Sequence, residues 1–231
     1  MRKIKIVITI LSALLIFNIA NIIAFAATNA AGDNYKICAA LPMYKNYTYY
    51  KTSSTPSIDT AIQNAMNTWN NASLQANSGN RINFFSLASG TKTCDINDSY
   101  NTIGSLVSYY DIISAGGTAT AIALNSRFTY NSGYIFFSDI MFNSNYSFGN
   151  GMSMQYYDYQ GILTHELGHT LGLDDLYENS IELDVDTVND LPVMYGSDTY
   201  GNASVNVTVL LRYIKQGDID GLAEVIDRRG F

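Results

Sequence analysis

Apolar residues recur at helical spacing in three stretches of the chain, and each stretch predicts a helix. The first helix is expected to begin near Ser57, a residue type favoured at helix N-termini, and to end near Asn70. Its apolar stripe consists of Ile58, Ile62, Ala65, Met66 and Trp69. The second helix is predicted from about Asp158 to Leu171, and the last begins near Gly217. One apolar face of the last helix is formed by Ile219, Leu222, Ala223 and Ile226.

Short runs rich in β-branched, aromatic and small apolar residues lie between the first two helices and predict strands. Glycine-containing turns separate these runs. The runs are Arg81–Leu87, Ser105–Tyr110, Thr118–Leu124 and Tyr134–Phe142. Residues 33–55 are also expected to be extended. This order of elements predicts an α+β fold, in which helices pack on a sheet.

The N-terminal residues 1–26 have the pattern of a cleaved secretory signal peptide. Three basic residues precede an apolar stretch that extends to about Phe17, and Ala24-Phe25-Ala26 fits the small-x-small pattern of a cleavage site. The alternative is an uncleaved membrane anchor, but Asn18 and Asn21 interrupt the apolar stretch. We therefore expect a secreted protein that has no membrane segment after cleavage.

The charge of the chain limits the classes of partner. It has 231 residues, with 13 Lys and Arg against 20 Asp and Glu, and a formal net charge of −7. The basic residues do not cluster, which argues against a nucleic-acid partner. Hydrophobic residues make up 47% and charged residues 14%, a composition typical of a folded domain.

Two cysteines, Cys38 and Cys94, are the only ones in the chain. An even number of cysteines in an exported protein favours a disulfide between them. Two alternatives remain open. Both thiols could be free and buried, or Cys38 could cap a metal ion in a latent form.

The strongest chemical signal is the sequence HELGHTLGLDD, which runs from His165 to Asp175. His165 and His169 are four residues apart on a predicted helix, so both imidazoles project from one face towards one ion. Glu166 is offset around the helix and can approach a metal-bound water without being a ligand. Gly172 can take a left-handed conformation and turn the chain back. Asp175 is then placed as a third ligand, with the adjacent Asp174 as the alternative, and three protein ligands are typical of a catalytic zinc site.

This motif resembles the extended zinc-binding motif of the metzincin metalloproteases, HExxHxxGxx(H/D). The later sequence LPVMYG resembles their Met-turn and assigns Met194 as the methionine beneath the metal. The helix containing Trp69 and the C-terminal helix are similar to the first and last helices of matrixin catalytic domains. Asp175 in place of the usual third histidine resembles the snapalysin-like metzincins. Because the chain has only two histidines, the structural zinc site of animal matrixins is expected to be absent.

The resemblance implies a metzincin-like fold, with a mixed twisted β-sheet, an N-terminal helix, an active-site helix and a C-terminal helix. It places a catalytic domain at residues 44–231, after an N-terminal extension at 27–43. It implies one catalytic Zn²⁺ and a monomeric endopeptidase that hydrolyses peptide or protein substrates by a zinc-bound water, with Glu166 as general base. The absence of a eukaryotic pro-region suggests a bacterial source.

Substrate contacts are also implied by the resemblance. An extended peptide would pair with the strand predicted at Thr118–Leu124, and Tyr195 would line a pocket or turn after the Met-turn. The backbone contacts would come from Thr118, Ala119, Thr120, Ala121 and Ile122.

Several alternatives stay open. A structural Ca²⁺ could bind the loop that contains Asp184, Asp186 and Asp190, although a solvated acidic loop explains these residues equally simply. The protein could be a catalytically silent binding protein for cell wall or carbohydrate on a metzincin scaffold, but the intact Glu166 disfavours this. Zinc chemistry alone also allows a hydrolase of non-peptide amides.

Overall fold

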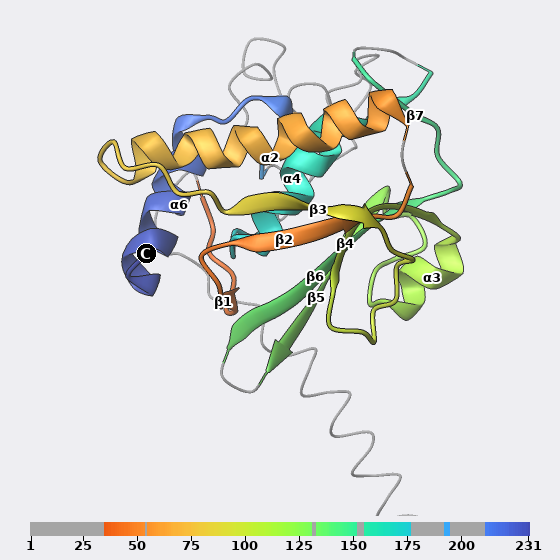
Figure 1. Cartoon of the computed structure of the whole chain (residues 1–231), viewed down its shortest axis with the longest axis horizontal. Coiled ribbons are helices and arrows are strands. Elements are labelled where there is room, and N and C mark those ends of the chain that lie inside the picture. The colour runs from red at the N-terminus through yellow and green to blue at the C-terminus, as the bar shows by residue number, and fades with distance from the viewer. Residues whose placement is uncertain (1–34, 54, 131–132, 152–154, 177–191, 195–210) are drawn as a thin grey trace, which may run out of the picture.

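The computed structural model describes residues 35–53, 55–130, 133–151, 155–176, 192–194 and 211–231 (Figure 1). The predicted signal peptide and residues 27–34 of the N-terminal extension lie outside these ranges, as do Tyr195 and the acidic residues Asp184, Asp186 and Asp190. Among the described helices, none is both long enough and apolar enough to cross a membrane.

A mostly parallel sheet of six strands forms the centre of the described part. Its strands are β1 (Leu41–Pro42), β2 (Tyr47–Lys51), β3 (Phe85–Thr91), β4 (Asn101–Val107), β5 (Ala123–Tyr130) and β6 (Tyr134–Asn143). They are ordered β1-β6-β4-β2-β3, and β5 pairs with β6. The β5–β6 pair is antiparallel, with Asn125 opposite Ile140, whereas the other pairs in this sheet are parallel. A second, two-stranded sheet joins β7 (Phe148–Gly149) to β8 (Tyr157–Asp158).

Four helices are present in the described residues, and the mixed α and β content agrees with the predicted α+β class. They are α2 (Pro56–Ala76), α3 (Tyr109–Ser114), α4 (Tyr159–Thr170) and α6 (Gln216–Arg229). Figure 1 shows α2 crossing the molecule beside the sheet, with α4 next to it and α6 near the C-terminus. Helix α2 contacts α4, α6 and β3, and α4 also contacts β5 and β6, so α4 lies between α2 and the antiparallel edge of the sheet.

The predicted apolar stripe of α2 is confirmed and the helix begins at Pro56, near the predicted Ser57, but the predicted N-cap and the predicted end near Asn70 are wrong. Its N-cap is Thr55, whose hydroxyl accepts a hydrogen bond from the Ile58 N–H, rather than Ser57. The helix continues past Asn70 to Ala76 because the amide of Asn70 is buried and bonds both backbone groups of Phe85 in β3. A side chain satisfied by the sheet does not compete with the helix backbone.

The predicted strand at Tyr134–Phe142 is confirmed as β6, whereas the other three strands between the helices are shifted. The residues expected at Ser105–Tyr110 are divided between β4 and α3, because Ser108 and Asp111 form a capping box that starts a helix. Residues 118–122 form a loop, and β5 begins only at Ala123. The amide of Asn143 holds this loop by donating to the carbonyls of Ala119 and Ala121.

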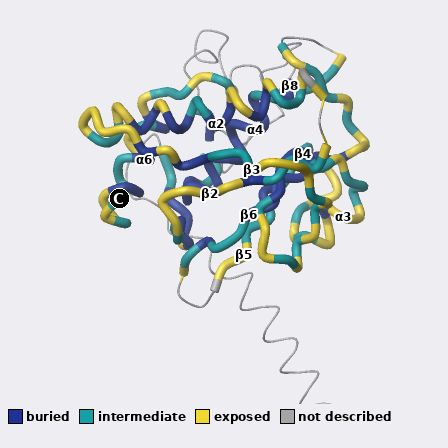
Figure 2. Tube along the Cα trace, viewed as in Figure 1, coloured by how far each residue is buried: buried dark blue, intermediate teal, exposed yellow. Residues whose placement is uncertain are grey.

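The core lies between α2, α4 and the sheet, where Figure 2 shows the buried part of the chain. Trp69 is fully buried in it, as the sequence predicts, and its indole N–H donates to the carbonyl of Thr164 in α4 at 2.7 Å. The other largest fully buried side chains include Tyr47, Tyr49, Phe84, Phe142, Ile62 and Met66. Helix α4 is buried on nearly every side, so its position is fixed by the core rather than by solvent-facing contacts.

The two cysteines are free thiols, and the predicted disulfide between Cys38 and Cys94 is not formed. Cys38 is buried near the end of α4, where its Sγ donates to the carbonyl of Leu173 at 3.2 Å. Cys94 lies before β4, beside the side chain of Thr102. The two thiols therefore have separate partners in different parts of the fold, which an even cysteine count does not reveal.

Candidate metal centre

Helix α4 is held at its N-terminus by a buried carboxylate. Asp158 is the N-cap, and its Oδ2 accepts from the N–H of Gly161 at 2.8 Å. Arg212, which precedes α6, binds both oxygens of Asp158 through Nε and Nη2. This bidentate pair ties the start of α4 to the C-terminal part of the chain.

The C-terminus of α4 ends as the sequence predicts. Gly172 has a φ of +83° in the left-handed region. The N–H of Gly172 donates to the carbonyl of His169, and the N–H of Leu173 donates to that of Gly168, which together form a Schellman motif. A Cβ at Gly172 would also come within 3.2 Å of Pro42. The turn sends Asp174 and Asp175 back along the face of α4.

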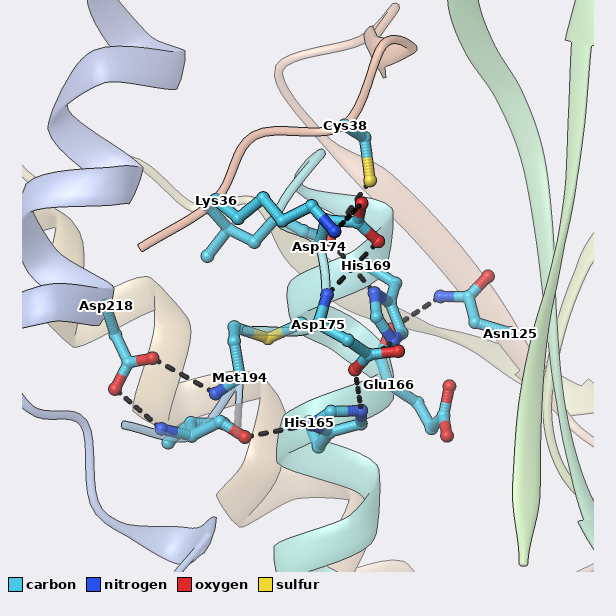
Figure 3. A network of polar contacts seen from close by, with 12 residues as sticks. Lys36, Cys38, Asn125, His165, Glu166, His169, Asp174, Asp175, Met194 and Asp218 are labelled. Atoms are coloured by element: carbon cyan, nitrogen blue, oxygen red, sulfur yellow. Dashed lines mark hydrogen bonds and ion pairs between the residues drawn. The ribbon is translucent and has the colours of Figure 1, made fainter. Parts of the chain in front are cut away.

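His165, His169 and Asp175, which we name the ligand cluster, converge in front of α4 (Figure 3). Asp175 Oδ1 lies 3.2 Å from Nε2 of His165 and 3.5 Å from Nε2 of His169. One ligand atom from each residue lies within 4.8 Å of the others, so these three residues could hold a metal ion. The two imidazole rings are nearly perpendicular, at 85°.

Hydrogen bonds behind the rings fix which nitrogen faces this centre. Nδ1 of His165 lies 2.8 Å from the carbonyl of Val193, and Nδ1 of His169 lies 2.9 Å from that of Leu173. A carbonyl only accepts, so both Nδ1 atoms carry the proton and both neutral Nε2 atoms present lone pairs. The buried Oδ1 of Asp175 then accepts no hydrogen bond from the described residues. Three acceptors facing one another require a cation, so the residues present fit a metal ion.

A proton is the one substitute that these residues offer for that cation. Burial acts to lower the pKa of His165, but the hydrogen bond and charge of Asp175 outweigh it and raise this pKa to about 9. Burial lowers the pKa of His169 to about 4. Burial opposes ionisation of Asp175, yet the hydrogen bond from His165 and the two imidazoles hold its pKa well below its usual range. The cluster therefore favours positive charge at its centre.

Asp174 does not join the ligand cluster. Its Oδ2 lies 3.3 Å from Nζ of Lys36, and its Oδ1 accepts from the backbone N–H of Asp175 at 3.1 Å. The structure thus distinguishes the two adjacent carboxylates that the sequence left as alternatives, and Asp175 is the one that faces the histidines.

Glu166 is buried at the side of the ligand cluster that faces β5 (Figure 3). Burial raises the pKa of Glu166 to about 7, although the charge of His165 acts in the opposite direction. Its backbone carbonyl accepts from Nδ2 of Asn125 in β5 at 2.5 Å. A carboxyl with a pKa near neutrality can both accept and return a proton.

Met194 lies under the ligand cluster and packs on Gly168 of the same motif. A Cβ at Gly168 would fall 2.2 Å from Met194 Sδ and 2.9 Å from Trp69, so this contact needs a glycine. The buried Asp218 of α6 accepts from the N–H groups of Val193 and Met194 at 2.8 and 3.2 Å. Asp218 therefore holds the carbonyl of Val193 where His165 binds it.

The roles of Gly168, Asp218 and Asn125 were not predicted from the sequence. A buried aspartate in the first turn of an apolar helix is a usable signal for Asp218, because such a carboxylate needs donors. Gly168 in the middle of a predicted helix is a second signal, since glycine there is costly unless a neighbour needs the space. Nothing in the local pattern marks Asn125.

The remaining predicted site residues are not among the three described residues of the ligand cluster. Residues 118–122 lie in the loop before β5, and Tyr195 lies outside the described residues. The thiol of Cys38 bonds the carbonyl of Leu173 and is not among the candidate ligands in the described residues.

Comparisons with known proteins add no assignment: no protein-family model matches the chain, and no curated protein matches it significantly.

Proposed function

We propose that the protein is a secreted zinc-dependent endopeptidase of the metzincin class. The observation that carries this proposal is the convergence of Nε2 of His165, Nε2 of His169 and Oδ1 of Asp175, while backbone carbonyls bind Nδ1 of both imidazoles. Two imidazole nitrogens and one carboxylate oxygen are a donor set that suits zinc, and three protein ligands leave a position for water. The motif and the Met-turn sequence support the choice of class.

A bound zinc ion would supply a Lewis acid for the peptide carbonyl and would lower the pKa of the attacking water. The protein residues supply the rest of the chemistry. The carbonyls of Val193 and Leu173 keep the Nδ1 atoms protonated, which orients both rings and increases the basicity of Nε2.

Glu166 is the general base in this proposal. Its carboxylate takes a proton from the attacking water and then returns it to the departing amine nitrogen. The described residues place no hydrogen-bond donor on this carboxylate, so it is available to water. Because it is buried, its pKa of about 7 suits transfer in both directions.

The substrate would pair with β5 rather than with residues 118–122. Within the described residues, β5 pairs on one side only, with β6, and an edge strand can accept an extended peptide through its backbone. The side chain of Asn125 on β5 donates a hydrogen bond to the backbone carbonyl of Glu166. This bond fixes the position of the general base relative to the strand that would bind the substrate.

The test is cleavage of a diverse peptide mixture by the purified protein and by Glu166→Gln. We expect kcat to fall about 10²–10⁴-fold in the variant because the base is removed, while bound zinc is unchanged. Asp220→Asn, which neutralises an exposed carboxylate on α6, is the matched control and should cleave normally.

Two results would contradict the proposal. Equal cleavage by the protein and Glu166→Gln would exclude Glu166 as the base. Zinc binding without cleavage of any peptide would favour the alternative of a silent binding protein.

A further inference from the structure

The N-terminal residues Tyr35–Cys38, which we name the strap, lie against the turn that carries the third ligand. The strap forms an antiparallel bridge, in which Ile37 is opposite Leu173. The N–H of Cys38 donates to the carbonyl of Gly172 at 2.7 Å, and the N–H of Asp174 donates to the carbonyl of Lys36 at 2.9 Å. These bonds join segments more than 130 residues apart in the sequence.

Side chains extend the contact from the strap to the ligand. Nζ of Lys36 lies 3.3 Å from Oδ2 of Asp174, and both side chains are about one-fifth exposed. The other oxygen of Asp174 accepts from the N–H of Asp175 (Figure 3). Lys36 therefore restrains Asp174, and Asp174 restrains the backbone of the ligand residue.

The strap is itself anchored at both ends. The hydroxyl of Tyr35 donates to Oε2 of Glu224 in α6 at 2.5 Å. Cys38 is buried, and its Sγ accepts from Nη1 of Arg127 at 2.9 Å and donates to the carbonyl of Leu173. That carbonyl also accepts from Nδ1 of His169, so the strap contacts the hydrogen-bond shell of two ligands.

Asp175 is held between two backbone bonds from distant segments. On its N-terminal side, Asp174 bonds Lys36 of the strap. On its C-terminal side, the N–H of Leu176 donates to the carbonyl of Met194 at 3.0 Å. Helix α4 places His165 and His169 without this help, whereas the third ligand follows a glycine turn and needs ordering from outside.

We propose that the strap is a positioning element of the metal centre and that Lys36 sets the affinity for zinc through Asp174. The proposal rests on the metal site of the proposed function but does not require peptidase activity. Neither Lys36 nor Asp174 is among the candidate ligands. The strap and Lys36 instead lower the free-energy cost of ordering Asp175 when zinc binds.

The experiment measures the Kd for Zn²⁺ of the purified protein by competition with a chromophoric chelator. Lys36→Met should raise this Kd about tenfold, at the low end of the range for groups outside the ligand shell. Lys36→Arg keeps the ion pair and should restore the affinity. Lys45→Met removes an exposed lysine elsewhere and is the matched control.

A double-mutant cycle assigns the effect to the pair. Asp174→Asn keeps an oxygen for the N–H of Asp175 but removes the charge that faces Lys36. If Lys36 acts through Asp174, the change in Kd for the double variant should be no larger than that for Lys36→Met alone. An unfolding midpoint measured without metal separates loss of zinc affinity from loss of the fold.

The outcomes distinguish the two proposals. A Kd for Lys36→Met equal to that of Lys45→Met overturns the strap proposal and leaves the metal site intact. No zinc binding by the unaltered protein overturns both proposals. Tight zinc binding that depends on Lys36, without any peptide cleavage, supports the strap and counts against the endopeptidase alone.

Discussion

Polar side chains gather on two sides of helix α4, and the two groups differ in how their hydrogen bonds are satisfied. In front lies the ligand cluster, whose three converging atoms are all acceptors. Behind lies a second group, the back network, formed by Tyr49, Asn125, Ser138 and Thr170. The Tyr49 hydroxyl lies 2.9 Å from both Ser138 Oγ and Thr170 Oγ1, and Asn125 bonds both of these residues.

The difference follows from the chemistry of the groups. Hydroxyls and amides both donate and accept, so the back network satisfies itself and stays neutral. Two Nδ1-protonated imidazoles and a carboxylate cannot do this at their converging atoms. Polar groups packed against the same helix thus have opposite roles: the satisfied group fixes the helix on the sheet, and the unsatisfied group is suited to bind a ligand.

The largest expected effect comes from removing the carboxylate of Asp175, whose Oδ1 has no hydrogen-bond donor among the described residues. Zinc at about 1,000 times its Kd should stabilise the protein by about 4 kcal/mol, equivalent to a rise in Tm of about 10 °C for a chain of this size. Asp175→Ala should abolish most of this rise because the third ligand is lost. Thermal unfolding with zinc and with EDTA measures it.

The exposed Asp227→Asn is the control for Asp175→Ala and should keep the full zinc-dependent rise. If zinc raised the Tm of Asp175→Ala as much as that of the unaltered protein, the ion would bind elsewhere. The unsatisfied acceptors in front of α4 would then not mark a metal site.

Sequence reasoning located the front face because its determinants are local. The spacing of His165 and His169, the turn at Gly172 and the placement of Asp175 lie within eleven residues, where helix periodicity and glycine conformation decide the geometry. The groups that hold these residues come from afar. Lys36 and Asn125 reach the site only through the tertiary fold, so no local pattern reveals them.

The same distinction explains the errors in the fold. The strand at Tyr134–Phe142 was predictable because most of its residues are aromatic or β-branched, the residue types favoured in strands. The boundaries of α2 and β4 depend on side chains such as Asn70 and Ser108, whose hydrogen bonds decide where an element ends. The cysteine count gave the wrong pairing, since pairing depends on where the fold puts each thiol.

Asp139 is a buried carboxylate that, unlike Oδ1 of Asp175, has hydrogen-bond donors, and its effect on stability depends on pH. Asp139 in β6 is 4% exposed, and its Oδ1 accepts from the N–H and the hydroxyl of Thr102. Burial raises its pKa from 3.8 to about 6 despite these donors. The folded state therefore binds more protons than the unfolded state between about pH 4 and 6, and this group lowers stability as pH rises through that window.

Asp139→Asn keeps an oxygen for Thr102 and removes the charge. Relative to the unaltered protein, the variant should gain up to about 3 kcal/mol of unfolding free energy between pH 4 and pH 8. Urea unfolding across this pH range measures the gain, and Asp227→Asn should show none. A variant that instead loses stability as pH rises would mean that the ionised carboxylate is the stabilising form.

The smallest expected effect concerns the back network, where Tyr49→Phe removes one hydroxyl and leaves the ring in place. Ser138 and Thr170 lie 2.9 Å apart and can still bond each other, so the loss of unfolding free energy should be about 1 kcal/mol. Tyr50→Phe is the matched control on the same strand. Its hydroxyl makes no hydrogen bond with the described residues, so its removal should change stability little.

The Kd for Zn²⁺ should be unchanged in both variants, because the back network positions α4 without contacting the ligand atoms. A weaker zinc site in Tyr49→Phe, at unchanged stability, would show that the two faces of α4 act as one polar system.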